Sequence, residues 1–92
     1  MPTIHKLRLD AAGASISGSI SDAGFTVVVP GRKVMESGRA IQRRDQRIAQ
    51  VKTSNTASGA QVTFQFRGKV PAYRVRLKGD FAEFLISAPT EQ

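Results

Sequence analysis

At 92 residues, the chain has room for one domain with a small hydrophobic core and not for two, because a single core typically serves roughly 100 to 150 residues. Its 40% apolar and 23% charged residues are typical of a folded globular domain and exclude a disordered or collagen-like chain. The 14 Lys and Arg residues outnumber seven Asp and Glu residues, and the resulting net charge of +7 favours polyanions as partners.

The chain contains no cysteine, which excludes a disulfide framework, a thiolate metal site and a cysteine nucleophile. No run of residues approaches the length of a membrane-spanning helix, which needs about 20 apolar residues. We therefore expect no membrane span in this sequence.

Alternating apolar and polar residues predict three short strands in the first third of the chain, at residues 4–9, 14–20 and 25–29. Serines alternate with aliphatic residues in the second of these, which is typical of a half-buried strand. The third ends at Pro30, which has no amide hydrogen to donate to a sheet.

The middle of the chain allows two interpretations. A helix over residues 39–51 would place Ile41, Ile48 and Val51 on one face. Such a helix would also crowd several arginines within one and a half turns, and this repulsion favours a loop followed by a strand at residues 47–53. Both alternatives stay open at the level of sequence.

The alternation returns in the second half of the chain. Residues 53–59 are small and polar, as in a hairpin loop, and strands are predicted at residues 62–66, 73–78 and 84–87. We expect the first two of these strands to pair as a hairpin. Six to seven short strands separated by turn signals predict an all-β fold, either a small β-sandwich or a partly open barrel.

Candidate catalytic and metal-binding residues are few. His5 is the single histidine, and a triad with Asp10 and a serine is conceivable, but a histidine in a first strand is more commonly a packing residue. The acidic residues mostly fall at predicted turns, where Asp bonds to its own backbone. One histidine without cysteine argues against a transition-metal site. We therefore expect neither an enzyme nor a cofactor.

Basic residues are clustered in two segments, 32–52 and 67–78. In the expected hairpin, alternate side chains share the outer face, which would carry Thr63, Gln65, Arg67, Arg74, Arg76 and Lys78. Guanidinium groups pair well with carboxylates and phosphates, so this face is a candidate anion-binding surface. A solvated strand face that discourages edge pairing would have the same composition.

Nucleic acid is an alternative polyanion for such a surface. Proteins that bind single strands usually add aromatic side chains on which bases stack. Four of the aromatic residues fall instead on the apolar faces of predicted strands: Phe25, Phe64, Phe66 and Tyr73.

Taken as a whole, the chain resembles the AMIN domain, a small β-sandwich that accompanies bacterial cell-wall amidases and type IV pilus secretins. The resemblance runs from residue 4 to residue 87. It is carried by the strand patterns at residues 4–9, 14–20 and 47–52, by Val29-Pro30-Gly31-Arg32 at the end of an apolar strand, and by the closing patterns at residues 62–66, 71–75 and 84–87.

The resemblance implies a non-catalytic domain that binds peptidoglycan in the periplasm and localises a larger protein. We accordingly expect residues 1–92 to be one AMIN-like domain excised from a longer envelope protein, with peptidoglycan or another anionic envelope polymer as partner, and other envelope proteins as further partners. The residues expected to pair with wall carboxylates are Arg32, Arg47, Lys52, Arg74 and Arg76. Alternatives from other classes are a nucleic-acid-binding module and a protein-interaction domain of an envelope assembly.

Overall fold

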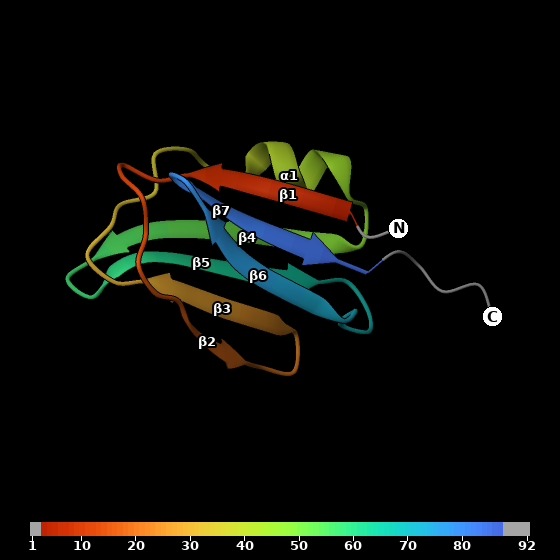
Figure 1. The fold of residues 1–92 in the computed structure, drawn as a ribbon. Coiled ribbons are helices and arrows are strands. Elements are labelled where there is room, and N and C mark those ends of the chain that lie inside the picture. Colours follow the sequence, from red (N-terminus) through yellow and green to blue (C-terminus); the bar gives the residue numbers. More distant parts are fainter. Residues whose placement is uncertain (1–2, 88–92) are drawn as a thin grey trace.

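The computed structural model describes residues 3–87, which form two antiparallel sheets and one short helix (Figure 1). The three-stranded sheet has the order β1 (Thr3–Arg8), β7 (Phe81–Ile86), β6 (Tyr73–Lys78). The four-stranded sheet has the order β2 (Ser17–Ile20), β3 (Gly24–Val29), β5 (Gly59–Phe66), β4 (Ile48–Thr56). The predicted all-β, sandwich-like class with seven short strands is confirmed.

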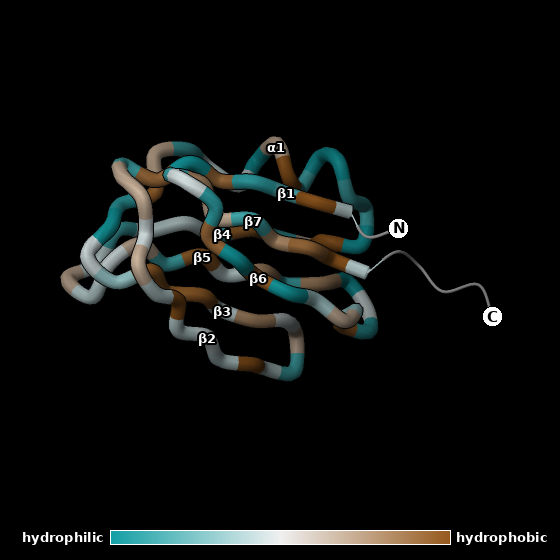
Figure 2. Tube along the Cα trace, viewed as in Figure 1, coloured by the Kyte–Doolittle hydropathy of each residue, from teal (hydrophilic) through white to brown (hydrophobic). Residues whose placement is uncertain are grey.

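The core lies between the two sheets, where the apolar faces of the alternating strands meet (Figure 2). Phe64 of β5 and Phe84 of β7 are fully buried, and their ring centroids lie 4.8 Å apart. Phe25 of β3 stacks on Phe64 and also on Tyr73 of β6. The Phe64–Phe84 and Phe25–Tyr73 contacts join strands of different sheets and so hold the two layers together, whereas the Phe25–Phe64 contact lies within the four-stranded sheet. The inward orientation expected for Phe25 and Phe64 is confirmed.

The expected hairpin between residues 62–66 and 73–78 is wrong. Both edges of β5 are already hydrogen-bonded, to β3 and to β4, so no edge of β5 is left for β6. The chain crosses to the other sheet after β5, and β6 pairs with β7 across a tight turn. Gly79 in that turn has a φ of +59°, a conformation that glycine adopts without steric cost.

The second predicted strand, at residues 14–20, is wrong in both length and burial. Only Ser17–Ile20 forms a strand, and all four of its residues are exposed, including Ile20 at 78%. A sheet of three strands cannot cover a sheet of four, and the strand left uncovered is the edge strand β2 (Figure 1). Ile16, just before β2, is the residue of this segment that packs against the core.

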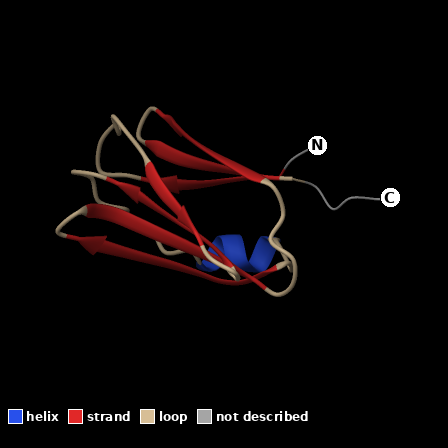
Figure 3. Cartoon of the chain, turned by 90° about the horizontal axis from the view of Figure 1, so that it is seen from below, coloured by secondary structure: helices blue, strands red, loops and turns tan. Residues whose placement is uncertain are grey.

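Each interpretation of the middle segment is partly right. A helix, α1 (Arg39–Arg44), forms but spans only six residues, and the strand that follows, β4, begins at Ile48. Ile41 is the buried residue of α1, which packs beside β4 at the edge of the four-stranded sheet (Figure 3). No helix within residues 3–87 is long and apolar enough to cross a bilayer.

The hairpin predicted at residues 53–59 has a shorter loop than expected. β4 continues to Thr56, which pairs with Gly59, so that the turn itself is Ala57 and Ser58. Gly59 has a φ of +131°, and a Cβ atom at this position would collide with the carbonyl of Val29. Only glycine therefore fits where β5 begins against β3.

Candidate anion-binding face

The outer faces of the two sheets differ in charge. The outward side chains of the four-stranded sheet are mostly Ser, Thr and Gln, and Lys52 of β4 is the single charged group among them. The outer face of the three-stranded sheet carries five cationic side chains, which we call the basic face: Lys6 and Arg8 from β1, and Arg74, Arg76 and Lys78 from β6. A polyanion is therefore attracted to one side of the sandwich more than to the other.

The register of the strands arranges the basic face in three rows, each of which crosses β1, β7 and β6. Strand β7 lies in the centre and contributes one residue to each row. The rows are Arg8–Phe81–Lys78, Lys6–Glu83–Arg76 and Ile4–Leu85–Arg74. The cations thus stand on either side of a central strip that is apolar at both ends and acidic in the middle.

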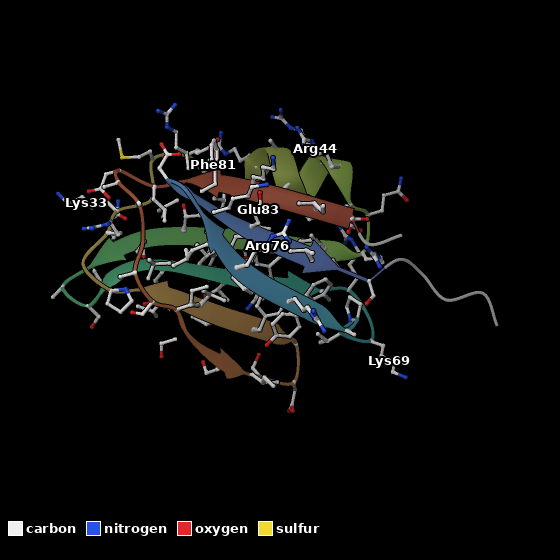
Figure 4. The ribbon with its side chains drawn as sticks, viewed as in Figure 1. Lys33, Arg44, Lys69, Arg76, Phe81 and Glu83 are labelled. Carbon is white, nitrogen blue, oxygen red and sulfur yellow. The ribbon has the colours of Figure 1, made fainter. Side chains whose placement is uncertain are left out.

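Glu83 is the carboxylate within this face, where it lies near Arg76 (Figure 4). It is almost fully covered, at 3% exposure. Arg76 donates a hydrogen bond from Nε to Glu83 Oε1 at 2.6 Å, and Lys6 Nζ lies 3.7 Å from Oε2. The hydrogen bond from Arg76 holds the pKa of the Glu83 carboxyl below its ordinary value of 4.5, against the opposing effect of burial. Glu83 is therefore ionised at neutral pH and orients the cation on each side of it.

The other cations of the face differ in how they are paired. Arg8 Nε lies 3.3 Å from Asp80 Oδ2 at the turn before β7, where both side chains are partly exposed. Among residues 3–87, no carboxylate lies within salt-bridge distance of Arg74 or Lys78. Arg74 and Lys78 are thus the two cations on β6 that can pair with an external anion without breaking a contact.

Phe81 adds an aromatic ring to the basic face. It is half-buried on β7, directly between Arg8 and Lys78 in the cross-strand register. Lys6 Nζ lies 6.0 Å from the centroid of this ring, at the outer limit of a cation–π contact. The expectation that Phe25 and Tyr73 face the core is correct, but an aromatic group on the basic face was missed.

The structure brings together two of the five predicted site residues, Arg74 and Arg76, which stand on neighbouring rows of the basic face. Lys52 lies on the outer face of the opposite sheet. Arg32 lies in the loop after β3 and connects it to the loop after β1, because its Nε donates a hydrogen bond to the carbonyl of Ala12 at 2.8 Å. The predicted set is therefore not one surface.

Arg47 is engaged in an internal ion pair. Its Nε and one terminal nitrogen donate to the two carboxylate oxygens of Asp45, at 2.9 and 2.7 Å, and its other terminal nitrogen donates to the carbonyl of Ser87 at 2.6 Å. The hydrogen bonds from Arg47 lower the pKa of Asp45, and the Asp45 carboxylate raises the pKa of Arg47. This bidentate pair joins the end of β7 to the segment between α1 and β4.

His5 lies against this pair in the interior. It is completely buried, and its Nε2 is 3.6 Å from Asp45 Oδ2, too far for a hydrogen bond. Burial lowers the pKa of His5, and the nearby Asp45 carboxylate opposes that shift. Asp10 is elsewhere, where its Oδ1 accepts the amide hydrogen of Lys33. His5 and Asp10 therefore do not form a triad.

Sequence reasoning left Lys6, Arg8 and Phe81 out of the candidate site. The alternation of β1 places Lys6 and Arg8 on the face opposite Leu7, so the sequence alone predicts that both side chains point outward. The strand predicted at residues 84–87 begins three residues too late, because β7 starts at Phe81, and the alternation of Phe81, Glu83 and Leu85 therefore goes unrecognised in the sequence. No local pattern in the sequence shows that β1 and β6 lie on either side of β7 in one sheet.

Comparison with protein-family models, curated proteins and solved structures found no match to this chain, so the AMIN resemblance stays a prediction. Within residues 3–87, no group of three or more His, Cys, Asp or Glu side chains comes together in a way that would hold a metal ion.

Proposed function

We propose that the chain is a non-catalytic binding domain that attaches the protein carrying it to peptidoglycan, or to another anionic polymer of the bacterial envelope, through the basic face. This function would place the domain in the periplasm. The observation that carries the proposal is the one-sided distribution of charge: five cations project from the three-stranded sheet, whereas Lys52 is the single charge on the opposite sheet.

The geometry of the basic face suits a polymer with repeated weak charges. The stem peptides of the cell wall carry free carboxylates, and Arg74 and Lys78 are available to pair with them. Each exposed pair contributes little, about 0 to 1 kcal/mol, so attachment depends on many domains or many rows engaging one polymer. Phe81 supplies an apolar surface between the cations, where the less polar side of a sugar ring can pack.

Co-sedimentation with isolated sacculi tests the proposal. We expect the wild-type chain to sediment with sacculi at moderate salt, and the double variant Arg74→Glu/Lys78→Glu to stay in the supernatant. Both replaced side chains are exposed, so the variant should keep its fold, which circular dichroism would verify.

A matched control separates the basic face from net charge. Lys33→Glu/Lys52→Glu changes the net charge of the protein by the same amount but leaves the basic face intact, because Lys33 lies in a loop and Lys52 on the opposite sheet. This variant should sediment nearly as well as the wild type. Equal loss of sedimentation in both double variants would refute a localised binding face.

Single-stranded nucleic acid is a second candidate ligand, favoured by the position of Phe81 among cations. Proteins that bind single strands combine a cationic surface with aromatic rings on which bases stack. In this case the affinity for an oligonucleotide, measured by fluorescence anisotropy, should fall steeply with salt, and the log–log slope should approach about 0.7 per phosphate contacted. No binding at low salt would exclude this candidate.

A further inference from the structure

A second basic region lies away from the basic face, in a groove between α1 and the adjoining ends of β4 and β5. The groove has a volume of about 420 Å³, within the usual size range of small-molecule sites. None of its lining residues belongs to β1, β6 or β7. Its lining consists of Arg39, Gln42, Arg43, Ile48, Ala49 and Arg67.

Three arginines line this groove, two from α1 and one next to the end of β5. Arg39 and Arg43 are four residues apart on α1 and so lie on the same side of the helix. Arg67 lies just after β5. Its Nε donates a hydrogen bond to the carbonyl of Gln46 at 3.0 Å, and this contact orients the guanidinium group. That bond leaves both terminal nitrogens of Arg67 free to donate to a ligand.

Gln42 adds a further donor to the groove. Its Oε1 accepts the amide hydrogen of Val51 at 2.8 Å, and this contact fixes the side chain and defines which end of the amide is oxygen. The amide nitrogen therefore has donor capacity left for a ligand in the groove. The polar side chains of the lining thus offer donors, and Ala49 is the exposed apolar residue beside them.

Among residues 3–87, no carboxylate lines the groove. Like charges four residues apart on a helix repel each other, so the Arg39–Arg43 arrangement is unfavourable for an empty groove. The acidic residue that follows α1, Asp45, is bound to Arg47 and does not line the groove. A bound anion would relieve this repulsion and satisfy the free guanidinium donors.

We propose that this groove is a binding site for the phosphate group of a small phosphate ester. A phosphate group presents several oxygens and up to two negative charges to the three guanidinium groups, whereas a carboxylate presents two oxygens and one charge. The volume leaves room for the organic part of a small ester beside Ala49. This site is separate from the basic face, so the proposal of a phosphate site and the proposal of polymer attachment can be tested independently.

Titration of the isotopically labelled chain with inorganic pyrophosphate, followed by ¹⁵N–¹H NMR, tests the proposal. We expect saturable shifts at the amides of α1 and around Arg67. The double variant Arg39→Gln/Arg43→Gln should bind pyrophosphate at least about tenfold more weakly, because it loses two charge-assisted donors. Gln has nearly the helix propensity of Arg, so α1 should persist in this variant.

A control variant and a control anion make the test decisive. Arg74→Gln/Lys78→Gln removes the same charge from the basic face, leaves the Arg76–Glu83 pair intact, and should leave pyrophosphate affinity nearly unchanged. Citrate of similar charge should bind much more weakly than pyrophosphate. Shifts confined to β1, β6 and β7, equal loss in both double variants, equal binding of citrate, or an absence of saturation would each overturn the phosphate site. Sedimentation with sacculi would be untouched by these outcomes.

Discussion

Arg76 donates a hydrogen bond to Glu83 at 2.6 Å, although 53% of the Arg76 side chain is exposed and only 4% of the Glu83 side chain is. A nearly covered carboxylate thus sits at the centre of a surface made of cations. It reduces the repulsion between the cations of β1 and β6, which would otherwise face each other across β7. Glu83 therefore stabilises the arrangement of cations on the basic face.

Glu83→Gln should strengthen polymer binding while it weakens the fold. The amide keeps the shape of the side chain but removes the negative charge, so affinity for sacculi at low salt should rise by roughly threefold. The free energy of unfolding should fall at neutral pH, because the pairs with Arg76 and Lys6 are lost. Sedimentation and urea denaturation measure the two effects, and Asp22→Asn, in an exposed turn, is the control.

The pH dependence of the Glu83 contribution has a defined sign. Its pKa is lowered in the folded state, so the stabilisation is complete above the ordinary value of 4.5 and is lost as the pH falls below that value. The wild type and Glu83→Gln should therefore converge in stability on acidification. A stability difference that stays constant from pH 7 to pH 3.5 would contradict the role given to this carboxylate.

Asp45→Asn should destabilise the protein by about 2 kcal/mol, because it leaves the partly buried Arg47 guanidinium without its bidentate partner. The loss concerns the junction between the end of β7 and the segment before β4, so hydrogen exchange should increase there first. Chemical denaturation at pH 7 measures the overall effect. Asp22→Asn, which removes an exposed carboxylate, should change stability by less than about 0.5 kcal/mol.

His5→Leu should make the fold less sensitive to mild acid. Burial lowers the pKa of His5 in the folded state, so the unfolded chain takes up a proton first, and stability falls as the pH drops below the ordinary value of 6.5. Leucine cannot titrate, and replacing His5 breaks no hydrogen bond, because neither ring nitrogen has a partner. The variant should match or exceed the wild type at pH 7.5 and exceed it clearly at pH 5.5. Parallel losses of stability over this interval would count against the assignment.

The sequence predicted the alternation of individual strands better than their partners. The burial of side chains along a strand has a period of two residues, which the strand's own sequence shows. Val62, Phe64 and Phe66 are a clear example. Which edge a strand pairs with depends on which edges other strands already occupy. The pairing of β5 with β3 and β4, and not with β6, is therefore information that no local segment contains.

The same reason explains why the sequence predicts only part of the basic face. The sequence predicts Arg74 and Arg76 together because they alternate on one strand. It does not group Lys6 and Arg8 with them, because these residues are more than 60 positions away along the chain. The sequence does not reveal that Asp45, two residues before Arg47, engages it in an internal pair. A sequence shows which residues are basic but not which of them are paired within the fold, and only the structure distinguishes the two groups.

Phe81 distinguishes the two candidate ligands of the basic face. Phe81→Leu keeps apolar bulk but removes the aromatic ring, and Phe81→Ala removes both. If the ligand is a cell-wall polymer, the Leu variant should bind sacculi almost normally and the Ala variant a few-fold more weakly. If the ligand is single-stranded nucleic acid, both variants should lose the stacking contact, worth about 1 to 3 kcal/mol per base.

Stability measurements must accompany that comparison, because a misfolded variant also fails to bind. Phe81 is half-buried on the outer face, so Phe81→Ala should cost only about 1 kcal/mol. Phe64→Ala, in contrast, empties the centre of the core and should cost about 3 to 5 kcal/mol, a large part of the stability of a small domain. Loss of binding in Phe81→Ala with an unfolding curve close to that of the wild type would assign the aromatic ring to the ligand. An unfolding midpoint as low as that of Phe64→Ala would assign it to the fold.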